Sequence, residues 1–144
     1  MSTVGDVLAA KGPEVATVTP NTTALQAANL MNERRIGALC VVDGETLVGV
    51  FTERDLLNRV VSGQRDPSTT KVAEVMTSSV ITCGLRGTVE DCATVMSHKR
   101  VRHLPVVEGA KLVGIVSTGD LMALQVAEKQ ALIEDLYEYL HGRT

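Results

Sequence analysis

Two short segments of the sequence place a hydroxyl side chain three residues before an aspartate. Residues 49–57 read GVFTERDLL and residues 114–122 read GIVSTGDLM, so the pairs are Thr52 with Asp55 and Ser117 with Asp120. Such a pair can cap a helix that starts at the end of a strand. Its carboxylate can also accept hydrogen bonds from the two adjacent hydroxyls of a ribose. A reciprocal cap favours the longer Glu or Gln, so the short aspartates favour a ligand-binding role in addition to capping.

A second group with useful chemistry is the basic run HKRVRH at positions 98–103. Cations at the end of a helix explain Lys99 and Arg100, whereas Arg102 and His103 lie at the start of an apolar segment typical of a strand. Successive side chains of a strand face opposite sides, so one of these two should face a neighbouring cleft. Arginine and histidine are suitable donors to phosphate. The candidate phosphate ligands are Arg102, His103, Arg54 and Arg100.

No set of residues is typical of a catalytic or metal site. The sequence has no glycine-rich phosphate loop, no paired carboxylates and no cluster with metal-ligand spacing. Cys40, Cys83 and Cys92 lie in apolar segments, which predicts small buried hydrophobic residues in a reducing compartment. We therefore expect neither enzymatic activity, nor a catalytic cofactor, nor a bound metal.

The composition excludes several classes of protein. Apolar residues make up 44% of the 144 residues, aromatic residues only 2%, and the net charge is −3. An acidic chain with few rings is poorly suited to nucleic acid, which attracts basic surfaces and stacks on aromatic side chains. No apolar run approaches the length of a membrane span, and the N-terminus lacks the layout of a signal peptide. These features predict a cytoplasmic protein that binds neither nucleic acid nor membrane.

The elements that position the aspartates occur twice in the chain. Residues 36–56 align without gaps on residues 101–121 at an offset of 65, with nine of 21 pairs identical. Further upstream, residues 4–8 resemble residues 72–76 at an offset of 68. The chain is therefore a tandem repeat, and one repeat alone would bury too little apolar surface to fold.

Both repeats predict the same order of elements. A short helix (4–11; 72–76) and a β segment (15–18; 79–82) precede an amphipathic helix capped at Thr23 or Thr88. A hairpin (36–51; 101–116), with Asp43-Gly44 or Glu108-Gly109 at its turn, and a final helix (53–61; 118–125) follow. Two such β-α-β-β-α units, packed sheet to sheet around a shared core, predict an α/β (α+β) domain with pseudo-two-fold symmetry and a cleft between its halves.

The tail predicts one more helix. Leu132, Leu136 and Leu140 recur every four residues, and Gly142 is a suitable C-terminal stop. This apolar stripe must pack on its own domain or on a second subunit. We divide the chain into repeat 1 (residues 1–65), repeat 2 (66–126) and a C-terminal amphipathic helix (127–144).

The doubled pattern resembles a known family. Two copies of strand, hairpin, Gly-x-x-[Ser/Thr]-x-x-Asp and leucine, in RRIGALCVVDGETLVGVFTERDLL and KRVRHLPVVEGAKLVGIVSTGDLM, resemble the cystathionine β-synthase (CBS) domain, and the tandem pair resembles a Bateman module. The resemblance covers residues 4 to about 126. It implies a stand-alone bacterial CBS-pair protein that senses an adenosyl ligand such as AMP, ADP, ATP or NAD in the inter-repeat cleft. It also implies a homodimer and a regulated partner protein, whose identity it does not give.

The resemblance also implies roles for individual residues. In this family the aspartate of the motif holds the ribose, which corresponds here to Asp55 and Asp120, with Thr52 and Ser117 beside them. Adenine is held by apolar walls and backbone amides at aligned positions. These positions are Thr17, Ile36, Gly37, Ala38, Ile81, Val101 and Gly119. Because Gly37 and Ala38 align with Arg102 and His103, we expect two unequal sites.

Three other functions remain open at this stage. The chain could be a structural dimerisation module whose clefts bind nothing. It could bind nucleic acid through the basic run, which the net charge disfavours. It could also sense redox state through a cysteine, although Cys40 aligns with Pro105 in a core strand, where a thiol is expected to be buried and inert.

Overall fold

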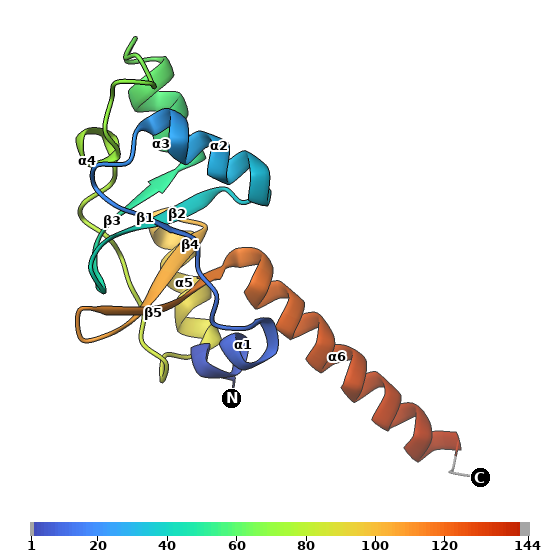
Figure 1. The fold of residues 1–144 in the computed structure, drawn as a ribbon. Coiled ribbons are helices and arrows are strands. Elements are labelled where there is room, and N and C mark those ends of the chain that lie inside the picture. The colour runs from blue at the N-terminus through green and yellow to red at the C-terminus, as the bar shows by residue number, and fades with distance from the viewer. Residues whose placement is uncertain (1, 142–144) are drawn as a thin grey trace.

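The two repeats build one five-stranded sheet flanked by helices (Figure 1). The structure is a computed structural model that describes residues 2–141. Repeat 1 contains α1 (Val4–Lys11), β1 (Thr17–Val18), α2 (Ala24–Arg34), β2 (Ala38–Asp43), β3 (Thr46–Thr52), α3 (Glu53–Asp55) and the π-helix η1 (Leu56–Val61). Repeat 2 contains α4 (Val72–Val75), α5 (Val89–Lys99), β4 (His103–Glu108), β5 (Lys111–Ser117) and α6 (Thr118–His141).

The two hairpins have the same register. Ala38 pairs with Thr52 in one hairpin and His103 pairs with Ser117 in the other, 65 residues later in both strands. The strand order β1-β2-β3-β5-β4 brings the hairpins together at their tips, where Thr46 pairs with Lys111. Each turn begins at a glycine with positive φ, 64° at Gly44 and 63° at Gly109, a conformation that glycine adopts without steric cost. The predicted pseudo-two-fold arrangement of an α+β fold is confirmed.

The predicted helix starts are also confirmed. The Thr23 side chain accepts from the Gln26 amide, and the Gln26 side chain accepts from the Thr23 amide, which is a reciprocal capping box. Thr88 caps α5 by accepting from the Asp91 amide. Both helices end at an arginine in the left-handed conformation, Arg35 and Arg100, each with φ 55°.

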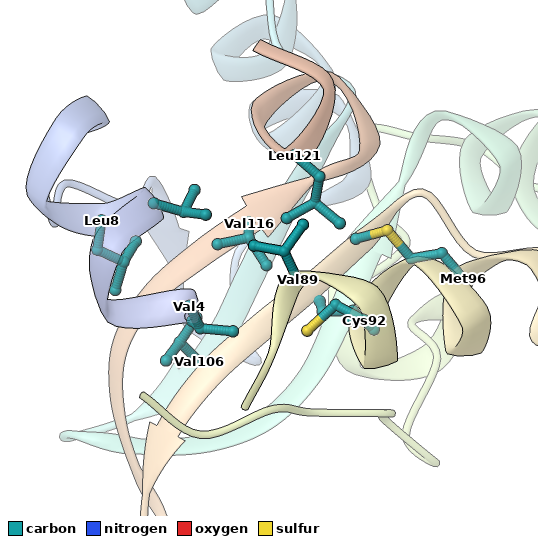
Figure 2. Packing of buried hydrophobic residues seen from close by; sticks show 10 residues of the cluster. Val4, Leu8, Val89, Cys92, Met96, Val106, Val116 and Leu121 are labelled. Carbon is teal, nitrogen blue, oxygen red and sulfur yellow. The ribbon is translucent and has the colours of Figure 1, made fainter. Parts of the chain in front are cut away.

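The expectation of one shared core is wrong, because the buried side chains form two clusters. One cluster joins α1 to α5, β4, β5 and the start of α6, and Figure 2 shows Val4 and Leu8 packed beside Val106 and Val116. The other joins α4 to α2, β1, β2, β3 and η1, with Val72 and Val75 of α4 among its members. The first short helix of each repeat therefore packs on the sheet of the other repeat.

Two local expectations are corrected. Residues 79–82 form no strand; a single parallel bridge between Cys83 and Val106 takes the place of the Val18–Val41 pairing of repeat 1. The helix expected at 118–125 and the C-terminal helix expected from residue 127 are one continuous helix, α6, since good helix formers occupy the positions where they meet. The predicted stop at Gly142 lies outside the described residues.

The long helix α6 leaves the body of the molecule and extends away from it (Figure 1). Leu121 in its first turn is buried, whereas its later apolar side chains are exposed, Leu132 at 66% and Leu136 at 56%. The predicted stripe is therefore present and does not pack on its own domain. Within residues 2–141, no helix combines the length and the apolar character that crossing a bilayer requires.

Candidate functional site

A cavity of about 400 Å³ opens between the two repeats at the end of the first hairpin. Its walls come from four segments: the turn between α2 and β2, the end of β3 with α3, the chain after α4, and the turn between α5 and β4 with the first residue of β4. The lining residues are Gly37, Val50, Thr52, Glu53, Arg54, Asp55, Thr77, Ser79, Val80, Ile81, Arg100, Val101, Arg102 and His103. We refer to this space as the Asp55 cavity.

The Asp55 carboxylate is buried at the inner end of the motif, with 6% of the residue exposed. It caps the helix reciprocally: Oδ2 accepts from the Thr52 amide at 3.1 Å, and the Asp55 amide donates to the Thr52 hydroxyl at 3.2 Å. The Thr77 hydroxyl lies 3.2 Å from Oδ1 and 3.3 Å from Oδ2, and Arg59 Nε lies 3.7 Å from Oδ1. Asp55 is therefore a cap residue that also lines the cavity, so its two predicted roles are geometrically compatible.

All four predicted phosphate ligands line this cavity. Within residues 2–141, the side chains of Arg54, Arg100 and Arg102 form no ion pair with an acidic side chain. Both Arg102 and His103 reach the cavity, because β4 begins only at His103 and the strand alternation does not apply to Arg102. Three guanidinium groups without acidic partners make this wall strongly attractive to an anion.

His103 lies among several charged groups. Burial lowers the pKa of the imidazole below its usual value, and Asp120 and Glu53 partly oppose that shift, whereas Lys11 and Arg102 add to it. The imidazole is therefore mostly neutral near pH 7. A bound phosphate would reverse this by favouring the charged ring.

The predicted adenine positions divide into two groups. Gly37, Ile81 and Val101 line the Asp55 cavity; Thr17, Ile36, Ala38 and Gly119 do not. The Glu53 side chain lies over the open face of Gly37, where a Cβ would collide with the carboxylate. A Cβ at Gly119 would meet only the Ser117 hydroxyl at 3.6 Å, so no tight packing requires glycine there.

The second aspartate has different surroundings from the first. Asp120 Oδ2 accepts from the Ser117 amide at 2.8 Å, which repeats the cap of Asp55. The same oxygen accepts from Lys11 Nζ at 2.6 Å, and Nζ also donates to the Ile115 carbonyl at 3.0 Å. Burial alone would raise the pKa of Asp120, but the hydrogen bonds from Lys11 and Ser117 outweigh it and hold the pKa below its usual value. Asp120 and Ser117 do not line the Asp55 cavity.

Five residues of the cavity, Val50, Glu53, Thr77, Ser79 and Val80, are not among the site residues predicted from the sequence, and neither is Lys11. The 68-residue offset contained a signal for two of them, because it aligns Ser79 with Lys11 and Thr77 with Ala9. This signal has a meaning only because α1 and α4 each pack on the hairpin of the other repeat, which places Lys11 beside Asp120 and Thr77 beside Asp55.

A wider cavity of about 600 Å³ lies next to the first, between α5 and the start of α6. Arg54, Arg100, Val101 and Arg102 line both cavities. The three guanidinium groups therefore lie between the two cavities, and an anionic group bound to them is accessible from both.

The cysteines offer no reactive thiol. Burial raises the pKa of Cys40 to about 12 and the pKa of Cys83 to about 12, and it raises the pKa of Cys92 as well. Thiols with such pKa values are poor nucleophiles at neutral pH. In the part of the chain that the structure describes, no group of three His, Cys, Asp or Glu side chains could hold a metal ion.

Comparisons with known proteins agree with this architecture. The family model described as CBS domain matches residues 4–62 and again residues 72–127. The chain is 37% identical over 131 residues to the CBS domain-containing protein YhcV of Bacillus subtilis (strain 168), with 91% of each chain covered.

Solved structures resemble the chain over most of its length. A protein with CBS domains from Burkholderia ambifaria MC40-6 is 40% identical, covers 88% of this chain and 95% of its own, and superimposes with a TM-score of 0.83. The CBS domain pair of protein MJ0100, in complex with 5′-methylthioadenosine and S-adenosyl-L-methionine, is 27% identical with a TM-score of 0.78. That match covers 89% of this chain and 98% of the other.

Proposed function

Because this chain belongs to the CBS-domain family and contains a tandem pair of the domains, we propose that it is a regulatory module that binds an adenosyl nucleotide in the Asp55 cavity. We propose binding and regulation as its function, without catalysis. The regulated partner is a separate protein.

The observation that carries this proposal is the combination of groups in one cavity. A buried carboxylate lines it together with three arginines that have no acidic partner among residues 2–141: Arg54 lies beside Asp55 in α3, and Arg100 and Arg102 lie in the turn between α5 and β4. A carboxylate suits the hydroxyls of a ribose, whereas guanidinium groups suit phosphates. One molecule that carries both groups would satisfy both sets of residues.

The remaining walls suit a nucleobase. Gly37, Ile81 and Val101 line the same cavity, where a flat apolar ring can pack. In this arrangement Asp55 and Thr52 hold the ribose, and Arg54, Arg100, Arg102 and His103 hold the phosphate. The volume of about 400 Å³ falls in the range of about 300–1,000 Å³ typical of sites for small molecules.

The class of ligand is supported by a structural relative. The MJ0100 domain pair holds 5′-methylthioadenosine and S-adenosyl-L-methionine, which both contain adenosine. The arginines of the present cavity favour members of this class that carry phosphate. We therefore propose AMP, ATP or NAD as the adenosyl ligand.

Regulation follows from where the cavity lies. Asp55 and Arg54 belong to the first repeat, whereas Arg100, Arg102 and His103 belong to the second. A ligand that contacts both repeats stabilises the one relative arrangement in which all these groups reach it. A partner protein that distinguishes this arrangement from others would read the presence of the nucleotide.

A thermal-shift panel tests the proposed function. AMP, ATP, NAD and S-adenosylmethionine are each titrated against the protein, with GMP and ribose 5-phosphate as controls for the base. A ligand at 100 times its Kd adds about 2.7 kcal/mol to the free energy of unfolding, or roughly 5–10 °C in Tm. If no adenosyl compound raises Tm, or if GMP raises it equally, the proposed adenosyl site is wrong.

A second candidate function, a structural dimerisation module, is favoured by α6. Val126, Ile133 and Leu140 repeat every seven residues along this helix and are all exposed, as are Met122, four residues before Val126, and Leu136. Such a heptad stripe is typical of helices that pair in a homodimer. Sedimentation of the protein and of an Ile133→Glu, Leu136→Glu variant tests the dimer, and a dimer with no ligand response would favour scaffold over sensor.

A further inference from the structure

The Asp120 site is occupied by a side chain of the protein itself. Lys11 Nζ contacts two groups there, the Asp120 carboxylate at 2.6 Å and the Ile115 carbonyl at 3.0 Å. Under the 65-residue offset, these residues are the counterparts of Asp55 and Val50. Both counterparts line the Asp55 cavity. The Lys11 ammonium therefore lies where the second repeat would have its equivalent of that cavity.

The helices α1 and α4 pack on their hairpins at equivalent positions. Leu8 of α1 lies against Gly114, and Met76, at the end of α4, lies against Gly49. Leu8 and Met76 correspond at the offset of 68, and Gly49 and Gly114 correspond at the offset of 65. Each helix thus meets its hairpin at the same point, and the difference begins only afterwards.

After Leu8 and Met76 the two segments of the chain differ in structure, and their sequences explain why. Residues 9–11 are Ala-Ala-Lys, which are good helix formers, and α1 continues to Lys11. Residues 77–79 are Thr-Ser-Ser, which are poor ones, and α4 ends at Val75. Thr77 then pairs with Val50 as a bridge, with both hydrogen bonds at 2.9 Å.

The carbonyls next to the two aspartates are therefore satisfied differently. The Val50 carbonyl accepts from the Thr77 backbone amide, which leaves the space beyond it open. The Ile115 carbonyl accepts from Lys11 Nζ, which fills that space with a charged group. At Asp55 the corresponding hydrogen bond comes from a neutral hydroxyl that a ribose hydroxyl can replace, and the nearest cation, Arg59 Nε, is 3.7 Å away. At Asp120 it comes from an ammonium ion at 2.6 Å.

We infer that Lys11 is a built-in occupant of the second site, so that each chain binds one adenosyl nucleotide, at Asp55. This inference rests on the proposed function, because it concerns the same class of ligand. A ribose at Asp120 would have to displace the ammonium, separate it from a carboxylate and leave the Ile115 carbonyl without its donor. Lys11 is thus a specificity-determining residue that makes two related sites unequal.

Calorimetric titration with AMP tests the inference on the full chain. The wild type is expected to bind one AMP per chain, and Lys11→Ala is expected to bind two. Alanine keeps the helix propensity of α1 and removes the ammonium. Lys99→Ala is the matched control, because Lys99 is the last residue of α5 as Lys11 is of α1 and it lines neither cavity. In Lys11→Ala/Asp120→Ala the second AMP should be lost while the first remains.

The outcomes separate this inference from the proposed function. If the wild type and Lys11→Ala both bind one AMP, or if the wild type binds two AMP as tightly as Lys11→Ala does, the inference is overturned and the adenosyl site stands. If the wild type binds no AMP while Lys11→Ala binds one through Asp120, Lys11 is the occupant of the second site as inferred, whereas the stoichiometry of one AMP at Asp55 and the proposed Asp55 site are both wrong. If neither protein binds AMP, both are wrong. A second AMP at least tenfold weaker in the wild type than in Lys11→Ala also supports the inference.

Discussion

At Asp55 a threonine hydroxyl contacts the carboxylate, whereas at Asp120 a lysine ammonium contacts it. Both aspartates cap a helix in the same way, through the amide of the hydroxyl residue three positions earlier. The backbone of the motif is thus repeated, and the difference comes from a segment more than 20 residues distant in one case and more than 100 in the other.

This contrast teaches that a repeated motif supplies the frame of a site and that the neighbouring element determines its use. The helix propensities of three residues, 9–11 after Leu8 and 77–79 after Met76, determine whether the site is filled or open. Because α1 and α4 each serve the other repeat, a change in either helix alters the site of the hairpin on which it packs.

The largest expected difference between the two sites is in the aspartates themselves. Asp55→Ala removes a buried carboxylate and should weaken AMP binding by 100-fold or more, about 3 kcal/mol, the upper range for hydrogen bonds to a charged group. Asp120→Ala should change AMP affinity less than threefold. Calorimetry measures both, and equal losses in the two variants would mean that the sites are equivalent. Because each variant also loses a cap of about 1 kcal/mol, urea unfolding must confirm that both are folded.

Alanine substitutions at the corresponding glycines Gly49 and Gly114 should lower the free energy of unfolding by different amounts. A Cβ at Gly49 would lie 2.5 Å from Met76 Sδ and 3.0 Å from the Thr77 backbone oxygen, whereas a Cβ at Gly114 would meet only the flexible end of Leu8, at 2.8 and 3.0 Å. Gly49→Ala is therefore expected to lower the free energy of unfolding by about 1–3 kcal/mol and Gly114→Ala by less. Urea unfolding measures both. Gly49→Ala should also weaken AMP binding, since it displaces the segment that lines the cavity, and a smaller loss at Gly49 than at Gly114 would contradict this account.

The two left-handed arginines provide a matched pair for the phosphate assignment. Arg35 and Arg100 have the same backbone conformation at corresponding helix ends, and only Arg100 lines the Asp55 cavity. Arg100→Ala should reduce AMP affinity about tenfold, or about 1.4 kcal/mol, through a lost charge-assisted hydrogen bond. Arg35→Ala should not reduce it, and neither variant should change the affinity for adenosine. A loss for adenosine at Arg100→Ala would remove the phosphate role.

The smallest expected effect is the pH dependence of binding. The lowered pKa of His103 keeps the imidazole neutral in the free protein, so phosphate binding must be accompanied by proton uptake. The sign is therefore a complex that becomes tighter as the pH falls from 8 to 6. NAD is the suitable probe because its phosphate diesters do not titrate in this range. His103→Gln should give a flat profile, and an unchanged slope in that variant would exclude His103 as the titrating group.

Much of the fold could be predicted from the sequence because the repeat doubles each signal. The hairpins, the Thr23 capping box and the helix starts follow from local patterns that occur twice. The exchange of α1 and α4 could not be predicted, since the helices are apolar on one face and either sheet would accept them. The length of α6 was missed because the apolar pattern weakens between residues 125 and 128, although nothing there stops a helix.

The same limit applies to the site. Thr52, Asp55 and the arginines were predicted from chemistry that is local in the chain, and the structure brings them together in one cavity. Thr77, Ser79 and Lys11 carry no local signal, because their positions depend on which hairpin the preceding helix meets. These residues act on sites that are distant from them in the sequence. The assignment of Ser117 and Asp120 to a ligand remains a prediction, because Lys11 contacts Asp120 in the structure.

The length of α6 gives the molecule a mechanical property. Its 24 residues span about 36 Å, and its first turn contains Asp120, which Lys11 ties to the body. A second contact, between the Ser2 hydroxyl and the Glu128 carboxylate, holds the helix further along, and the large apolar side chains beyond it are exposed (Figure 1). The 13 residues after Glu128 span about 20 Å, so a rotation of about 5° about that contact moves the tip of the helix by about 2 Å. A small rotation of the body is thus enlarged at the end of this helix.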